Sequence, residues 1–367
     1  MIVIAGGGTG GHTSPGLAVA AALRARGVAC AWIGSRSGLE ARRAPEAGIP
    51  YHAIRTGKLR RALAWQNVPD VFVNAPAGVL QAWRLLRRLR PRVVFATGGF
   101  VALPVALAGA LARVPVVVHE QTAVPGLANR VAARLARRVA VTFAESARLF
   151  GGTPTVVTGN PLRPELRSGS RAAALERFGF DPVLPLVYVT GGAQGSHAIN
   201  RAVGEVLPAL LTHTQCLHQS GDNRATGDRT WLQARRAALT PTLAARYALR
   251  PWVGDELADV YAAAALVVSR AGAGTVNECC QLGVPALYIP LPSAAGDEQT
   301  ANARLVERAG GCSILPQASM TPLLLLERIQ TLLAEPARLK DMGERARTLA
   351  VPDAAERLAD LLLEIAA

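Results

Sequence analysis

The sequence predicts an α/β protein with two doubly wound domains, each a parallel sheet covered by helices on both faces. Short apolar runs alternate with Ala-, Leu- and Arg-rich stretches along the whole chain, which is typical of βα units. A length of 367 residues favours two domains. Glycine-rich turns that follow a strand and open a helix occur in both halves, at 6–11 and again near Gly191 and Gly272.

Strands are predicted wherever a short apolar run is bounded by turn residues. In the first half they cover 2–5, 29–34, 93–97, 116–119, 139–141 and 155–158. In the second half they cover 186–190, 215–219, 249–252, 266–269, 286–289 and 312–315. Helical stretches lie between them, beginning with 17–26, and a last helix is predicted at 353–366 after Pro352.

A Pro-flanked turn at 159–164, followed by a polar stretch, marks the predicted domain boundary. The first domain then covers 1–163 together with the C-terminal helix at about 350–367, and the second covers 164–349. Because ligands bind beyond the carboxyl ends of parallel strands, the cleft between the two domains is the expected site.

Charge and composition limit the class of protein. Half of the residues are apolar and only 18% are charged, which excludes a disordered chain. The formal net charge of +14 comes almost entirely from arginine, since Lys58 and Lys340 are the only lysines. These arginines are either dispersed and solvated or favour an anionic partner. With no nucleic-acid motif and few aromatic residues, an anionic membrane surface is the better candidate than nucleic acid.

Cysteines and apolar stretches point to a chain in a reducing compartment. The five cysteines are scattered, without metal-binding or C-x-x-C spacing. The chain opens on a strand rather than on a basic signal segment. Its longest apolar stretch, 101–118, is interrupted by Pro104, Arg113 and Pro115 and is too broken to span a bilayer. We therefore expect a cytosolic protein that touches a membrane from one side.

The first glycine turn ends at His12, which is the candidate catalytic residue. Bare backbone N–H groups and a helix N-terminus suit an anionic group. We find no acidic residue closing the second strand at 34–36, so a dinucleotide site is disfavoured. His12 is either a buried, satisfied histidine or a group that the turn delivers to the site.

Three further turns repeat the arrangement. They are 97–100, 190–196 and 269–278. In the last, small residues allow a diphosphate to approach a helix N-terminus near Thr275, and Glu278 one turn later suits ribose hydroxyls; alternatively, Glu278 only stabilises the helix dipole. Gln299 and Asn302 share a helix face suited to sugar hydroxyls. No Asp-x-Asp motif occurs, so we expect no metal and no cofactor.

Taken together these segments resemble the MurG family of GT-B glycosyltransferases, which transfer N-acetylglucosamine in peptidoglycan synthesis. The matching segments span the chain in order: 7–12, 97–100, 119–121, 159–163, 191–195, 218–221, 270–278, 299–303 and 351–353. The set is specific, although each glycine turn alone is not. The resemblance implies a GT-B fold with the donor, UDP-GlcNAc, in the second domain and a polyprenyl-diphosphate acceptor at the first.

The resemblance also implies roles for individual residues. On the donor side it implies Arg163, Ala193, Gln194, Ser196, Val253, Ala273, Gly274, Thr275, Val276, Asn277, Glu278, Gln299 and Asn302. On the acceptor side it implies Thr9, Gly10, Gly11, Gly98, Gly99, Thr122 and Asn129, with His12 as the catalytic candidate. The sequence departs from the family at Thr122 (usually Asn), at Ala193 (usually Ser, for which Ser196 is the nearest substitute) and at Glu298 (often His or Gln).

A basic, amphipathic segment is the candidate membrane face. Between 55 and 92, arginines alternate with apolar residues that include Trp65 and Trp83. Either 83–90 is a helix packed on the core with a wet arginine face, or it docks on anionic lipid. The second interpretation places the protein peripherally on the cytoplasmic face of the inner membrane.

The sequence thus leads us to expect an inverting transfer of GlcNAc to the C4 hydroxyl of lipid-linked N-acetylmuramyl-pentapeptide, converting lipid I to lipid II. His12 would act as base or orient the acceptor, and helix N-termini would stabilise the departing diphosphate. Two alternatives remain open at this point. One is a related UDP-sugar enzyme, such as a glycolipid glucosyltransferase or an epimerase. The other is a basic UDP-sugar-binding or nucleic-acid-binding protein without catalytic activity.

Overall fold

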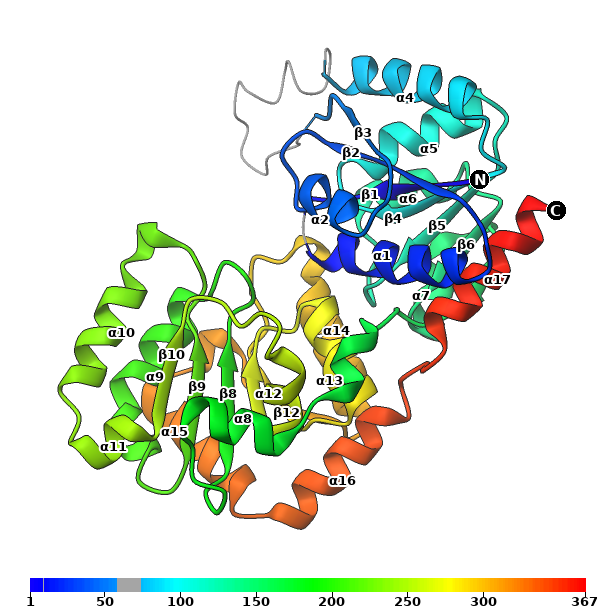
Figure 1. Ribbon diagram of the computed structural model, residues 1–367. Helices are drawn as coiled ribbons and strands as arrows, with labels where there is room; N and C mark the ends of the chain where they lie inside the picture. Colours follow the sequence, from blue (N-terminus) through cyan, green and yellow to red (C-terminus); the bar gives the residue numbers. More distant parts are fainter. Residues whose placement is uncertain (9, 58–73) are drawn as a thin grey trace. The chain divides into compact units, whose positions relative to one another are not determined.

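The computed structural model describes residues 1–8, 10–57 and 74–367 (Figure 1). Two compact units are present: unit 1 comprises Met1–Arg163 and Val351–Ala367, and unit 2 comprises Pro164–Ala350. Both units are parallel α/β sheets with helices on both faces, so the predicted fold class is confirmed.

Unit 1 is built on a seven-stranded sheet in the order β3-β2-β1-β4-β5-β6-β7. Its strands are β1 (Ile2–Gly6), β2 (Cys30–Ser35), β3 (Tyr51–Ile54), β4 (Val93–Gly98), β5 (Val116–Glu120), β6 (Arg138–Val141) and β7 (Thr155–Val157). Its described α-helices are α1 (Gly10–Ala25), α2 (Glu40–Glu46), α4 (Ala75–Leu89), α5 (Ala102–Leu111), α6 (Leu127–Ala133), α7 (Ala144–Ala147) and α17 (Ala354–Ala366).

Unit 2 is built on a six-stranded sheet in the order β10-β9-β8-β11-β12-β13. Its strands are β8 (Leu186–Thr190), β9 (Gln215–Gln219), β10 (Tyr247–Arg250), β11 (Ala264–Ser269), β12 (Ala286–Tyr288) and β13 (Cys312–Ile314). Its α-helices are α8 (Arg171–Phe178), α9 (His197–Leu210), α10 (Asp228–Ala237), α11 (Pro241–Ala245), α12 (Leu257–Ala263), α13 (Ala273–Leu282), α14 (Glu298–Arg308), α15 (Pro322–Leu333) and α16 (Pro336–Arg347).

Three local expectations are corrected by the structure. The edge strand β3 was not predicted, because Tyr-His-Ala-Ile is not an apolar run. The strand expected at 249–252 is β10 and ends at Arg250, since Pro251 cannot donate a ladder hydrogen bond. The first helix begins at Gly10 rather than at residue 17.

The C-terminal helix α17 belongs to the core of unit 1. In β1 successive side chains alternate between the two faces of the sheet. Ile4 faces a cluster that contains Leu23 of α1 and Leu358 and Leu362 of α17, all fully buried. Burial of each such leucine contributes about 1.5–3 kcal/mol, which explains why the end of the chain packs on unit 1.

Both sheets reverse their strand order at a single place, between β1 and β4 in unit 1 and between β8 and β11 in unit 2. The glycine-rich turns follow these four strands. In open parallel sheets the ligand site lies beyond the carboxyl ends of the strands at this reversal. The topology of each unit therefore selects these turns as the places to look for a site.

Candidate functional site

The turn after β1 is packed so closely that it needs glycine. A Cβ on Gly6 would lie 1.9 Å from the Thr97 hydroxyl oxygen, and one on Gly7 would lie 2.1 Å from the carboxyl carbon of Glu40. A Cβ on Gly8, whose φ is +90°, would meet the Phe100 ring at 2.7 Å. Thr9, one of the predicted binding residues, lies outside the described residues.

Glu40 organises this turn and was missed by sequence reasoning. Its side chain is fully buried and accepts hydrogen bonds from the backbone N–H of Gly8 at 2.9 Å and of Ser35 at 3.0 Å. The Ser35 hydroxyl donates to it at 2.6 Å. Glu40 is the first residue of α2, five residues beyond the end of β2, and it binds the protein's own backbone. The only sequence signal was a glutamate five residues beyond a strand that ends in serine.

His12 lies in the first turn of α1 and is held by the strands beside it. Its Nδ1 is 3.1 Å from the Thr97 carbonyl oxygen and 3.1 Å from Gln121 Oε1. The Thr97 hydroxyl donates to the His12 carbonyl at 2.7 Å. The ring is half-buried, and Nε2 forms no hydrogen bond to a described residue. One ring nitrogen is thus fixed by the protein, and the other has no partner in the part of the chain that the structure describes.

Gly98 and Gly99 bring the end of β4 against this ring. Their φ angles are +102° and +79°. A Cβ on Gly98 would lie 2.8 Å from His12 Nδ1, and one on Gly99 would lie 2.3 Å from the Gly7 carbonyl oxygen. Gly10 and Gly11 are the first two residues of α1 and directly precede His12. These glycines therefore lie next to His12.

The loop after β5 is held by the buried carboxylate of Glu120. It accepts from the backbone N–H of Thr122 at 3.0 Å, from the Thr122 hydroxyl at 2.7 Å and from Asn129 Nδ2 at 2.9 Å. The Thr122 side chain is thus engaged in shaping the loop. Asn129 is buried, and its Oδ1 has no hydrogen-bond partner within the described part of the chain. An orphaned acceptor costs about 1–3 kcal/mol, which a ligand donor or a water would offset.

In unit 2 the turn after β8 leaves two predicted residues exposed and uses a third as a cap. Ala193 and Gln194 are exposed. Ser196 is 6% exposed, and its hydroxyl oxygen caps α9 by accepting from the Ile199 N–H. This bond occupies a lone pair of the hydroxyl oxygen and leaves the Ser196 O–H as a donor.

The turn after β11 opens the N-terminus of α13 to solvent. The helix begins at Ala273, two residues before the expected start at Thr275, with extended Gly272 as N-cap. A Cβ on Gly272 or on Gly274 would meet nothing within 4 Å. The first N–H groups of a helix have no intrahelical acceptor and carry partial positive charge. Open space before such a terminus suits an anionic group.

Farther along α13, Glu278 is half-buried and accepts a hydrogen bond from the Tyr261 hydroxyl at 2.7 Å. Burial raises the pKa of Tyr261 well above its usual value, so Tyr261 remains a donor. Sequence reasoning missed Tyr261 because it lies on a different helix. Val276 and Asn277 are buried, so their side chains belong to the packed face of α13.

The two predicted amides of α14 lie in different environments. Asn302 is fully buried and donates to the Ala271 carbonyl at 3.1 Å, so it supports the turn after β11. Gln299 is half-buried, and its Oε1 accepts from the Leu291 N–H at 3.0 Å. Arg270, which was not singled out, donates to the carbonyls of Ile289 and Pro290 and fixes the same turn.

Val253 lies after β10 and is 1% exposed. Its backbone N–H donates to Gln219 Oε1 at 2.9 Å, while Gln219 Nε2 donates to the Gly192 carbonyl at 3.1 Å. Gln219 therefore links this segment to the turn after β8.

Arg163, at the end of the first segment of unit 1, is half-buried.

A buried polar network begins at His218 on β9 and continues to Asn200 and Asp228. His218 Nε2 is 3.0 Å from Asn200 Oδ1, and Asn200 Nδ2 is 3.1 Å from Asp228 Oδ2. Burial lowers the pKa of His218 to about 3, so this ring is neutral in the folded protein.

Across residues 1–8, 10–57 and 74–367, no group of three His, Cys, Asp or Glu side chains is placed to hold a metal ion.

The basic segment forms α4, and its two faces differ. Leu86 is buried, and Trp83, Leu85 and Leu89 pack against the unit 1 core, so these apolar residues serve the fold. The face turned to solvent carries Leu80, Arg84, Arg87, Arg88 and Arg90. Other residues of the expected patch, among them Arg60, Arg61 and Trp65, lie outside the described residues.

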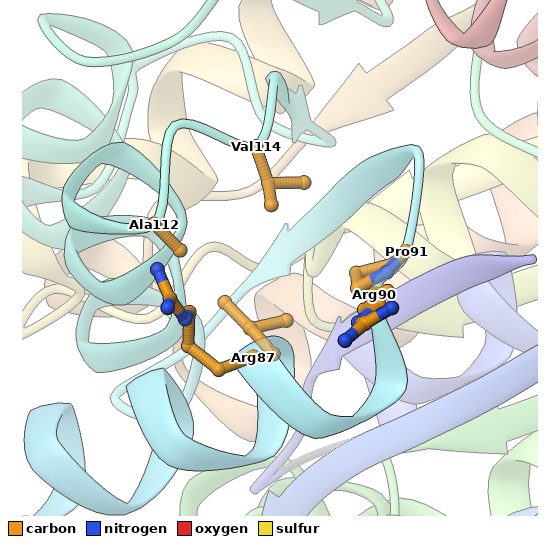
Figure 2. A pocket seen from close by; sticks show the side chains of 6 residues that line it. Arg87, Arg90, Pro91, Ala112 and Val114 are labelled. Atoms are coloured by element: carbon orange, nitrogen blue, oxygen red, sulfur yellow. The ribbon is translucent and has the colours of Figure 1, made fainter.

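A hollow of about 390 Å³ lies between α4 and the end of α5. Figure 2 shows the side chain of Arg87 beside Ala112, with Val114 above them and with Arg90 and Pro91 across the hollow. Leu111, the last residue of α5, is 68% exposed. None of the helices in the described ranges is both long and apolar enough to span a bilayer.

Two family models match successive segments of the chain. Residues 2–141 match the glycosyltransferase family 28 N-terminal domain, and residues 186–358 match its C-terminal domain. The chain is 41% identical over 365 residues to the UDP-N-acetylglucosamine–N-acetylmuramyl-(pentapeptide) pyrophosphoryl-undecaprenol N-acetylglucosamine transferase of Alkalilimnicola ehrlichii, covering 99% of this chain and 98% of that protein. It is 40% identical to the Halorhodospira halophila enzyme of the same name, covering 100% and 98%.

Solved structures show the same relationship. MurG of Acinetobacter baumannii superposes with a TM-score of 0.73 at 30% identity, covering 99% of both chains. A UDP-GlcNAc 2-epimerase from Neisseria meningitidis has a TM-score of 0.68 at 12% identity, which shows a shared fold only. On sequence and fold together, this chain belongs to glycosyltransferase family 28 and, within it, to the MurG family of N-acetylglucosamine transferases.

Proposed function

We propose that the protein transfers N-acetylglucosamine from UDP-GlcNAc to the C4 hydroxyl of undecaprenyl-pyrophosphoryl-N-acetylmuramyl-pentapeptide, converting lipid I to lipid II in peptidoglycan synthesis. This proposal rests on about 40% sequence identity, over the whole chain, to enzymes that are named for this transfer. The transfer is inverting: the acceptor hydroxyl attacks C1 of the sugar, UDP leaves, and a β-1,4 linkage forms.

Unit 2 would bind the donor. The open N-terminus of α13 suits the diphosphate, because its first N–H groups have no partner within the helix. These groups would also stabilise the charge that develops on UDP as it leaves. The Glu278 carboxylate, oriented by Tyr261, would accept hydrogen bonds from the ribose hydroxyls. The segment at Val253 would contact the uracil, with Arg163 and Gln299 contributing to the donor site.

Unit 1 would bind the acceptor and supply the base. His12 has one ring nitrogen held by Thr97 and Gln121, and the other forms no hydrogen bond to a described residue. An imidazole in this state can accept the proton of the attacking hydroxyl. The turns at Gly10, Gly98 and Gly99 around it would receive the sugar and diphosphate of the acceptor.

A membrane-facing role for α4 is part of this proposal. Its solvent face carries several arginines and the exposed Leu80, and Leu111 is exposed at the end of α5. This surface is therefore basic and includes exposed apolar side chains. Such a surface suits anionic headgroups and peripheral attachment at the cytoplasmic face of the inner membrane, where a polyprenyl acceptor resides. In a sedimentation assay with anionic vesicles, replacing Arg84, Arg87 and Arg88 by Glu should abolish binding. Unchanged sedimentation would refute the proposed face.

The function is tested by measuring UDP release from UDP-GlcNAc with and without a short-chain analogue of lipid I. We expect release only when the acceptor is present, and the same rate with a chelator, because the sequence lacks an Asp-x-Asp motif. Release that does not depend on the acceptor, or conversion of the free sugar nucleotide to an epimer, would refute the proposal.

A further inference from the structure

A chain of hydrogen bonds crosses unit 1 from Gly159 to His12, and the direction of each bond can be assigned. It begins at His119, which is fully buried on β5. His119 Nε2 lies 3.0 Å from the Gly159 carbonyl oxygen. A carbonyl only accepts, so Nε2 carries the proton. Burial lowers the pKa of His119 to about 4, so the ring is neutral and its Nδ1 is an acceptor.

Gln121 is the next member, and its amide has only one orientation that satisfies its neighbours. Its Nε2 lies 2.6 Å from the Thr97 carbonyl oxygen and 3.1 Å from His119 Nδ1, which are both acceptors. The opposite orientation would place the amide oxygen against these two acceptors. The NH₂ group therefore faces Thr97 and His119, and Oε1 faces His12.

The orientation of Gln121 decides the state of the His12 ring. His12 Nδ1 faces two oxygen acceptors, Gln121 Oε1 and the Thr97 carbonyl, each at 3.1 Å. Nδ1 must therefore donate, and in a neutral imidazole the lone pair then lies on Nε2. Because Gln121 is uncharged, it orients the ring without adding a negative charge that would favour the imidazolium form.

We propose that Gln121 is the positioning residue that holds His12 in its Nδ1–H tautomer, so that Nε2 is the atom that takes the proton of the substrate hydroxyl. His119 supports Gln121 from behind by occupying one of its N–H groups. The inference rests on the proposed function, in which His12 is the base, but the tautomer itself can be observed without any substrate.

The test uses the full chain labelled with ¹⁵N-histidine, at a pH where the His12 ring is neutral. Long-range ¹H–¹⁵N correlations distinguish the two tautomers, and a His12→Gln variant identifies the His12 signals among the six histidines. We expect a proton on Nδ1 and none on Nε2 in the wild type, and a mixture of tautomers in Gln121→Met. A wild-type ring protonated on Nε2 overturns the proposal. A Gln121→Met ring that stays entirely Nδ1–H overturns the role of Gln121, since Thr97 alone would then suffice.

Gln215→Met is the matched control. Gln215 is also a fully buried glutamine, and its Nε2 donates to two backbone carbonyls, at 2.8 and 3.0 Å, in unit 2. Gln121→Met should lower kcat about tenfold, the worth of one hydrogen bond, with the KM for UDP-GlcNAc unchanged. Gln215→Met should leave kcat and the His12 tautomer unchanged. Equal kcat in the two variants would overturn the proposal. A wild type that is inactive with the lipid acceptor would refute the proposed function, while the spectra would still decide the tautomer.

Discussion

Replacing Gly98 by alanine would test the geometry around His12 at a single methyl group. The added Cβ would lie 2.8 Å from His12 Nδ1 and 3.0 Å from its Cε1. Non-bonded carbon contacts are comfortable at about 3.5–4.0 Å. The ring must therefore move by about 0.5–1 Å to make room for the methyl group.

Two effects follow from that methyl group. A displacement of about 1 Å in a catalytic group costs about 100-fold in rate. The φ of +102° at Gly98 is also unfavourable for alanine and costs about 1–3 kcal/mol of stability. We therefore expect kcat to fall about 100-fold, the affinity for UDP to stay unchanged and unit 1 to unfold at a lower temperature.

Gly27→Ala supplies the control for backbone strain. Gly27 also has a positive φ, +72°, but its Cβ would meet nothing within 4 Å. This variant should lose about 1–2 kcal/mol of stability and keep its kcat. The assays are UDP release with the lipid acceptor, titration calorimetry with UDP and thermal unfolding. If folded Gly98→Ala retains a kcat within about threefold of that of Gly27→Ala, the argument that His12 must be held in place is wrong.

Three other predictions concern the base, the donor site and the buried histidines. His12→Ala should lower kcat by about 10²–10⁴-fold with little change in UDP affinity; an equal loss in both would indicate a binding role. Tyr261→Phe removes the hydrogen bond that orients Glu278 and should weaken UDP binding about tenfold by calorimetry, and unchanged affinity would exclude Glu278 as a ribose ligand oriented by Tyr261. Burial lowers the pKa of His218 to about 3 and that of His119 to about 4, whereas unfolded histidine titrates near 6.5. Below pH 6.5 the unfolded chain therefore binds more protons, and each histidine removes about 1.4 kcal/mol of stability per pH unit. Urea unfolding between pH 7.5 and 5 measures this, and a free energy of unfolding that stays constant over that range would contradict it.

The strands and the glycine turns were readable from the sequence because they depend on local pattern. The observed bounds of β8 and β9 equal the predicted ones, since each is a buried stretch between turn residues. Four glycine turns were placed correctly after β1, β4, β8 and β11, because a strand that runs into a glycine turn is a local signal. The edge strand β3 lacked such a signal.

The support of the candidate site could not be read from the sequence, because it consists of contacts between distant residues. Glu40 holds the Gly8 N–H across 32 positions, and Gln121 holds His12 across 109. Asn302 was expected to bind a sugar but is buried against Ala271. Helical spacing places it on the same face as Gln299, and only packing decides which part of that face is covered.

The sequence by itself determined two parallel α/β domains, the glycine-rich turns that follow buried strands and His12 as the candidate base, since hydrophobic periodicity and glycine positions are local properties. The tertiary structure alone decided which nitrogen of His12 is held and which polar side chains support the turns. It also decided that a Cβ on Gly272 or Gly274, at the start of α13, would meet no atom within 4 Å. These depend on donor and acceptor pairings and on burial, which arise only when distant strands and helices pack together.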